Sequence, residues 1–179
     1  MLGCLILTAQ SRAQITNQYP ATLLETLENA AGQVVVKGTA PIGTMSVGST
    51  IVSVVCKEDK LISTGNKQYG VMIGIKPGGQ AEDRTVIDYD EMASLLGSVD
   101  YLLKVDWSVT SLASFDASYT TRAGLRLKAF SSKRTSKIEY ALNGSHLTKG
   151  ILLSPDQVSQ FYALVAQAKA KLDTLQNGQ

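Results

Sequence analysis

The stretch Thr85-Val-Ile-Asp-Tyr-Asp-Glu91 decides the fold, because three strand residues run there directly into the start of a helix. Asp88 and Glu91 have the spacing of a helix capping box, in which each side chain accepts a hydrogen bond from the backbone of the other residue. Apolar residues then recur at the period of one helix face: Met92, Leu95, Leu96, Val99, Leu102 and Leu103. The pattern predicts a helix over residues 89–104.

A second junction of the same kind occurs at Ile151-Leu-Leu-Ser-Pro-Asp-Gln157, with Pro at the first helical position. The apolar stripes behind the two junctions match in four places: Met92 with Val158, Leu95 with Phe161, Val99 with Val165, and Leu102 with Ala168. About four strand candidates precede each helix. We therefore expect an α+β fold of two ββββα units, residues 32–105 and 113–175, with antiparallel sheets packed on two long helices. The alternative is coincidence, because strands that run into capped helices are common.

Four strands are expected in the first unit, after a short helix that begins near Pro20: residues 34–36, 51–57, 69–75 and 84–87. The Pro41-Ile-Gly43 sequence is expected to break the first of them. The polar residues 58–66 are expected to form a turn or loop. Gly70 and Gly74 leave the third strand with one nearly bare face, which is typical of a half-buried strand.

The second unit has alternating apolar residues in four further stretches: residues 115–121, 125–129, 138–142 and 147–153. Asn143-Gly144 predicts a tight hairpin turn between the last two stretches. The connector before them, residues 106–114, contains the only tryptophan, Trp107, which we expect to pack over the edge of the core.

The first thirteen residues, MLGCLILTAQSRA, have features of a secretory signal: an apolar run followed by a small-x-small cleavage site. Cleavage after Ala13 would leave one domain, residues 14–179, that is periplasmic or secreted. Leu2-Gly3-Cys4 also resembles the end of a bacterial lipobox, which would instead make a lipid-anchored Cys4 the mature N-terminus and requires an upstream start. A positively charged n-region is missing, so this interpretation requires an upstream start or a vestigial signal. The alternative is a short buried strand or helix. After cleavage Cys56 would be the remaining thiol, and its apolar surroundings predict a buried, inert side chain.

Composition argues against several classes of function. Hydrophobic residues make up 44% of the chain, charged residues 18%, and the net charge is only +2, so no polyelectrolyte partner is indicated. The single histidine, His146, is interpreted as a solvated turn residue, so a hydrolase triad or a zinc site lacks members. Asp88, Asp90 and Glu91 could be imagined as calcium ligands, but helix capping explains them more simply. We expect no enzymatic activity, cofactor, metal or transmembrane span.

The strongest charge feature is a basic segment with interleaved aromatic residues, which forms the one candidate binding patch: Arg122, Arg126, Lys128, Lys133, Arg134 and Lys137, with Tyr119, Phe130 and Tyr140. Such a sheet face could bind phosphates while bases stack on the rings. The simpler interpretation is a solvated hairpin tip whose charges protect a strand edge. Arg126 and Lys128 point outward if Leu125 and Leu127 belong to the core, which suits either interpretation.

The doubled ββββα order of residues 32–175, with its two strand-cap-helix junctions, resembles the Whirly and PUR-type single-stranded nucleic-acid-binding folds. The resemblance implies curved sheets that carry basic and aromatic residues, with the helices behind them. It assigns no residue a role, and fold does not fix function. Our leading hypothesis is an exported, non-enzymatic binding or structural domain of the bacterial cell envelope, with a protein or small-ligand partner. The alternative is a single-stranded nucleic-acid-binding protein that uses the basic sheet face.

Overall fold

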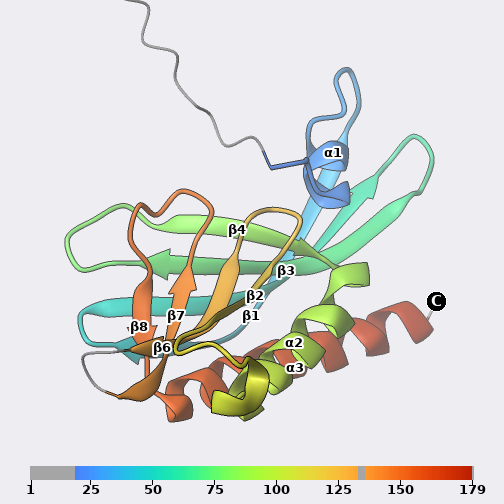
Figure 1. Cartoon of the computed structure of the whole chain (residues 1–179). Helices are drawn as coiled ribbons and strands as arrows, with labels where there is room; N and C mark the ends of the chain where they lie inside the picture. The colour runs from blue at the N-terminus through green and yellow to red at the C-terminus, as the bar shows by residue number, and fades with distance from the viewer. Residues whose placement is uncertain (1–18, 133–135, 179) are drawn as a thin grey trace, which may run out of the picture.

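The structure is a computed structural model that describes residues 19–132 and 136–178. Residues 1–13, for which a signal sequence is expected, lie outside the described residues. The elements follow the expected order (Figure 1): α1 (Leu23–Glu28), β1 (Val35–Val47), β2 (Thr50–Leu61), β3 (Lys67–Lys76), β4 (Asp83–Asp88), a 3₁₀ turn (Tyr89–Glu91), α2 (Met92–Lys104), a second 3₁₀ turn (Trp107–Val109), β5 (Asp116–Thr120), β6 (Arg126–Ser132), β7 (Lys137–Asn143), β8 (Ile151–Leu153) and α3 (Pro155–Asn177).

Within the described residues, the strands form two antiparallel sheets of four, in the orders β1-β2-β3-β4 and β5-β6-β7-β8. Each sheet is a meander that runs into a helix, α2 after the first sheet and α3 after the second. The α+β class and the two-unit ββββα architecture predicted from the sequence are therefore confirmed.

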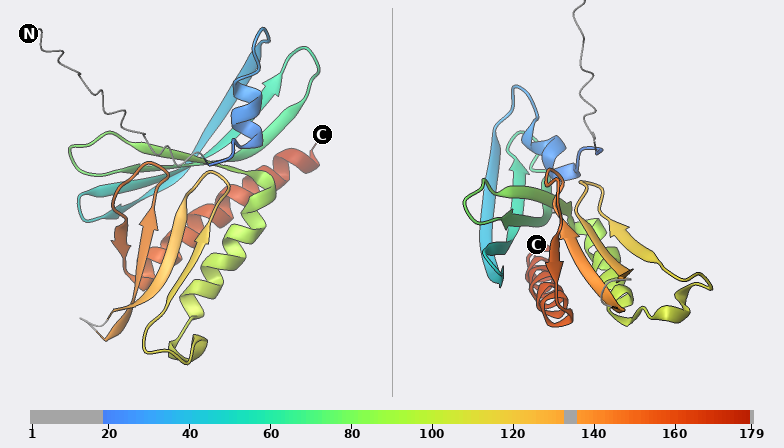
Figure 2. Two further views of the ribbon diagram at one scale, coloured as in Figure 1. Left: turned by 45° about the horizontal axis from the view of Figure 1, so that its top comes forward. Right: turned by 60° about the vertical axis from the view of Figure 1, so that its left-hand side comes forward.

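The two helices are exchanged between the units. Helix α2 contacts β5 and β6 of the second sheet, whereas α3 contacts β1, β2 and β3 of the first sheet. The Sγ atom of Cys56 in β2, buried as predicted, lies 3.5 Å from the Ala168 carbonyl of α3. Figure 2 shows the two helices crossing beneath both sheets. Because each unit supplies the helix that covers the other, neither sheet has a complete core of its own.

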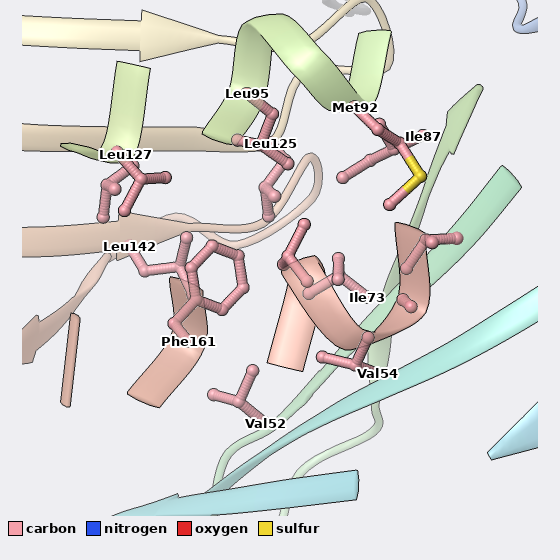
Figure 3. Packing of buried hydrophobic residues seen from close by; sticks show 14 of the residues in the cluster. Val52, Val54, Ile73, Ile87, Met92, Leu95, Leu125, Leu127, Leu142 and Phe161 are labelled. Carbon is pink, nitrogen blue, oxygen red and sulfur yellow. The ribbon is translucent and has the colours of Figure 1, made fainter. Parts of the chain in front are cut away.

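A single apolar core results from this exchange. The eight stripe residues that match between the units are each 2% exposed or less. In Figure 3, Phe161 of α3 lies near Leu142 of the second sheet and Val52 of the first, and all three belong to one buried cluster. Full burial of a side chain of this size contributes roughly 1.5–3 kcal/mol.

Helix α3 begins as predicted. The Ser154 hydroxyl accepts a hydrogen bond from Gln157 N, and the Gln157 side chain accepts one from Ser154 N, which completes a capping box ahead of Pro155. Among the described residues, neither α3 nor another helix is long and apolar enough to cross a membrane.

Strand β1 continues through Pro41, contrary to the expectation that Pro41-Ile-Gly43 would break it. β1 is the edge strand of its sheet. Ile62 N donates to the Val34 carbonyl at 3.0 Å, and bonded pairs alternate along antiparallel strands, so position 41 directs its backbone nitrogen to the open edge. Proline is tolerated here because a backbone N–H at this position would make no hydrogen bond to β2. The register shifts just after Pro41, which absorbs the extra residue Ile42.

Strand β2 extends to Leu61, so the prediction of a loop over residues 58–66 was wrong for its first four residues. Helix α1 packs on this end of the sheet and covers the outer face of β2 and β3. Asp59 is fully buried and Lys57 is 8% exposed, although polarity alone assigns such residues to solvent.

Helix α1 also covers the face of β3 that the sequence leaves bare. A Cβ atom at Gly70 would lie 2.5 Å from Cδ1 of Leu24 and 2.3 Å from the Ile87 carbonyl oxygen. Gly70 therefore lets α1 approach the strand backbone directly. β3 is covered on both faces here instead of being half-buried.

The connection between β7 and β8 is a loop of residues 144–150, not the two-residue turn predicted from Asn143-Gly144. Gly144 does not adopt a positive φ, which such a turn would require. A Cβ at Gly144 would lie 2.0 Å from Oδ2 of Asp83 in β4. The glycine thus serves the close approach of the two sheets.

Candidate functional site

The residues of the predicted basic patch do not lie on one surface. Arg126 and Lys128 lie on the outward face of β6, as the alternating register predicts, with Phe130 next along the same face. Lys128 pairs with Asp116 at 3.3 Å and lies 5.8 Å from the centre of the Phe130 ring. Lys137 is exposed at the start of β7.

The two tyrosines of the patch lie on the opposite face of the sheet. Tyr119 belongs to the face of β5 that packs toward α2, and Tyr140 is 6% exposed within the core. Burial raises the pKa of both phenols. Neither ring shares a surface with Arg126 and Lys128. Lys133 and Arg134 lie outside the described residues.

Arg122 is held by acidic partners in the loop between β5 and β6. Its guanidinium donates to Asp88 at 2.7 Å and to Asp90 at 3.0 Å, and its backbone N donates to Glu91 at 2.7 Å. The bond to Asp90 is the main reason that the pKa of Arg122 is raised. Arg122 therefore fastens the second sheet to the start of α2, and its charge is compensated.

Asp88 caps a different helix from the one predicted. Its side chain makes no capping bond at its own helix start. Instead it accepts hydrogen bonds from Leu23 N at 2.7 Å and Leu24 N at 3.1 Å, which are the first amides of α1. The local capping-box prediction for Asp88 and Glu91 was therefore wrong, because α1 and Arg122 compete successfully for the two carboxylates.

His146 has an exposed ring, as predicted, and a structural contact that the sequence did not indicate. Its backbone N donates to Asp83 at 3.0 Å, and Nδ1 lies 3.1 Å from the other Asp83 oxygen. The Ser145 hydroxyl lies 2.9 Å from the same Nδ1 atom. A catalytic triad uses both ring nitrogens, one for the acid and one for the nucleophile. This arrangement joins β4 to the β7–β8 loop and does not form a proton relay.

A buried charge cluster lies beneath α1. The Lys57 ammonium donates to Glu28 of α1 and lies 3.7 Å from Asp59. Burial raises the pKa of Asp59 to about 6, and both of its oxygens lack a hydrogen-bond partner. Burial acts to raise the pKa of Glu28, but Lys57, with smaller effects from Asp59 and Lys37, lowers it further than burial raises it, so the pKa is lowered overall. The cluster links α1 to β2.

An apolar groove adjoins β5. It has a volume of about 550 Å³, lies between β5 and α2, and its walls are mostly apolar. Helix α2 lines the groove with an uncharged stripe, Ser94, Gly97, Ser98 and Tyr101. Strand β5 lines it with three consecutive residues, Ala117, Ser118 and Tyr119. We call this groove, the open edge of β5 and the adjoining connector the β5 surface.

Large apolar side chains extend the β5 surface toward the α2–β5 connector, which projects from the molecule in Figure 2. Tyr101 is 57% exposed, and a smaller hollow joins it to Val109. Trp107 is 48% exposed, and its ring meets Phe115 edge to face with centroids 6.0 Å apart. Neither ring belongs to the core cluster or to the side chains packed against it, so the predicted packing of Trp107 over the core edge is not observed. Contiguous exposed apolar area of this kind is typical of interaction sites.

The β5 surface was not predicted from the sequence. Spacing alone could have indicated it, because Ser94, Gly97, Ser98 and Tyr101 follow one helix face beside the buried stripe. Among the described residues, no three His, Cys, Asp or Glu side chains are grouped to hold a metal ion. No protein-family model matches the chain, and no curated protein matches it significantly.

Proposed function

We propose that this chain is a non-catalytic protein-binding or structural domain that acts in the bacterial cell envelope after export. The β5 surface is the observation that carries the proposal, because it combines exposed aromatic side chains with a strand edge that has no partner strand among the described residues. Export is inferred from the apolar run and small-x-small site of residues 1–13.

The polar groups that could perform chemistry support a non-catalytic role, since they are bonded into the scaffold. Asp88 and Arg122 join α1 to the second sheet, and Asp83 and His146 join the two sheets. A catalytic group instead needs a free lone pair or proton that faces a substrate cavity.

Single-stranded nucleic-acid binding is a second candidate, favoured by the shared outward face of Arg126, Lys128 and Phe130. The inward position of Tyr119 and Tyr140 and the pairing of Lys128 with Asp116 make it the weaker candidate. An oligothymidylate titration distinguishes the two. We expect weak binding that changes less than threefold in the Arg126→Glu/Lys128→Glu double variant. Tight binding that is steeply salt-dependent and lost in the double variant would replace our proposal.

The proposal is tested by fractionating cells that express the gene with its upstream region and by photo-crosslinking from two surface positions. A photoreactive phenylalanine analogue at Tyr101 is compared with one at Tyr162, an exposed tyrosine of α3 away from the groove. We expect a processed product in the envelope fraction and protein crosslinks from position 101 but not from position 162. An unprocessed cytosolic product, or equal crosslinking at both positions, would contradict the proposal.

A further inference from the structure

We infer that a second copy of this chain docks antiparallel along β5, so that the two second sheets join into one eight-stranded sheet across a two-fold axis. The inference rests on the proposed function, since it names the partner of the β5 surface. Four observations lead to it: the state of the other sheet edges, the direction of the β5 amides, the match of side chains in the joined register, and the stripe on α2.

The other three sheet edges are protected against pairing. β1 carries Pro41 and a register shift on its edge, and β8 has only three residues. β4 is covered by the β7–β8 loop, where Ser145 N donates to the Thr85 hydroxyl at 3.3 Å. β5 contains neither proline nor lysine nor an irregularity in its described pairing. Exposed edges without such devices are the ones that pair with another chain.

Three alternate positions of β5 direct their backbone groups toward the open edge. Thr121 N donates to the Leu125 carbonyl at 2.8 Å, and Ser131 N donates to the Phe115 carbonyl at 3.0 Å. Bonded pairs alternate along the two strands, so the odd positions of β5 bond to β6. The N–H and C=O groups of the even positions, Asp116, Ser118 and Thr120, therefore face the open edge.

A two-fold axis at Ser118 uses all of these groups. Ser118 would face Ser118 of the second copy, and Asp116 would face Thr120 of the second copy, each as a bonded pair. Thr120 is also the β6 neighbour of Arg126, whose Nε donates to the Thr120 hydroxyl at 3.0 Å. Asp116 would thus enter the reach of Arg126 from the second copy, and no like charges would stand opposite each other.

The two α2 helices would also meet across the same two-fold axis. Ser94, Gly97 and Ser98 of α2 line the groove beside β5, so pairing of two β5 strands would bring these residues of the two copies together. A Cβ at Gly97 has no other atom within 4 Å, which leaves room for a partner helix. Small uncharged residues allow such an approach, and Tyr101 would be covered at the end of the stripe. A strand from an unrelated protein would explain the open edge of β5 but not the small uncharged residues on α2. A second copy explains both features, so we take it as the partner.

The inference is tested by sedimentation velocity on the purified chain from residue 14. Protein concentrations from about 5 to 200 μM are used, because the fraction of dimer depends on concentration. Ser118→Pro removes one of the N–H groups on the open edge of β5. Thr39→Pro is its control: like Pro41, position 39 directs its backbone nitrogen to the open edge of β1. Gly97→Arg places two like charges at the helix contact, and Ala163→Arg adds the same charge at an exposed position of α3, on the side opposite its buried stripe. Circular dichroism verifies that each variant is folded.

We expect a dimer in the native chain and in both controls, and at least a tenfold weaker association in Ser118→Pro and Gly97→Arg. If Ser118→Pro fails to fold, Gly97→Arg and its control Ala163→Arg decide the question. A monomeric native chain at 200 μM, or equal association in Gly97→Arg and Ala163→Arg, would overturn the inference. A monomer that still crosslinks from position 101 to another envelope protein would overturn it while the proposed function stands.

Discussion

Asp88 and Arg122, which are 34 residues apart in the chain, form an ion pair at 2.7 Å in which the Asp88 side chain is 2% exposed. The same carboxylate accepts two backbone hydrogen bonds from the start of α1. Asp88 therefore holds three segments together: α1, the end of β4, and the loop between β5 and β6.

Replacing Asp88 with Ala is expected to lower the free energy of unfolding by about 3 kcal/mol, because two buried amides and one guanidinium lose their acceptor. Arg122→Gln is expected to cost less, about 1 kcal/mol, since Asp88 keeps its backbone donors. Urea denaturation measures both. Lys104→Gln is the matched control, because the exposed Lys104–Asp100 pair contributes only about 0.3–0.5 kcal/mol. A loss for Asp88→Ala as small as that of the control would show that Asp88 does not fasten these segments.

Gly70→Ala tests the close packing of α1 on β3. The added methyl group would lie within 2.5 Å of both Leu24 and the Ile87 carbonyl, so the helix must move away. We expect a loss of about 1–3 kcal/mol in urea denaturation, as for other overpacked sites, with faster hydrogen exchange in α1. Gly38→Ala in β1 is the control, since its nearest contact would be an ordinary 3.5 Å. Equal stability of the two variants would refute the assigned packing.

The charge cluster beneath α1 predicts a pH dependence of stability. Burial raises the pKa of Asp59 from 3.8 to about 6, so the folded state keeps a proton that the unfolded chain releases. The contribution of Asp59 is fully present below about pH 4 and is lost as the pH rises through about 6; it is on the order of 3 kcal/mol. Glu28 acts in the opposite sense, because Lys57 and Lys37 help to lower its pKa.

The Asp59 contribution is isolated by comparing the native chain with Asp59→Asn, which retains Glu28, Lys57 and Lys37. We expect the stability of the variant relative to the native chain to rise between pH 4 and pH 7. Urea denaturation at half-unit pH intervals gives the difference directly. Parallel pH profiles for the two proteins would show that Asp59 has the same pKa in the folded and unfolded states.

Phe161→Ala tests the exchange of helices between the units. The side chain is fully buried in the shared core, so its removal is expected to cost about 3–5 kcal/mol. Because Phe161 belongs to one buried cluster with residues of both sheets, hydrogen exchange should accelerate in β2 and in β7 together. Tyr162→Ala, at the exposed neighbouring position, should cost less than about 1 kcal/mol. Acceleration confined to one sheet would mean that the units unfold separately.

The sequence by itself determined the elements whose signals are local. Ser154 and Gln157 cap the helix that follows them, and the matched stripes ending at Leu102 and Ala168 are buried as their spacing predicts. Alternation also placed Arg126 and Lys128 on the outward face of β6. In each case the neighbours that decide the outcome lie within a few residues in the chain, so periodicity and capping carry the information.

Only the tertiary structure decided how Asp88, Pro41, Asp59 and the β5 surface are used. Asp88 has a capping pattern as clear as that of Ser154, yet it bonds to α1 because a buried carboxylate takes the donors that three-dimensional packing brings to it. Pro41 is tolerated because β1 became an edge strand, and Asp59 is buried because α1 folds over it. The exchange of α2 and α3 follows from core packing between residues far apart in the chain, which no local pattern encodes.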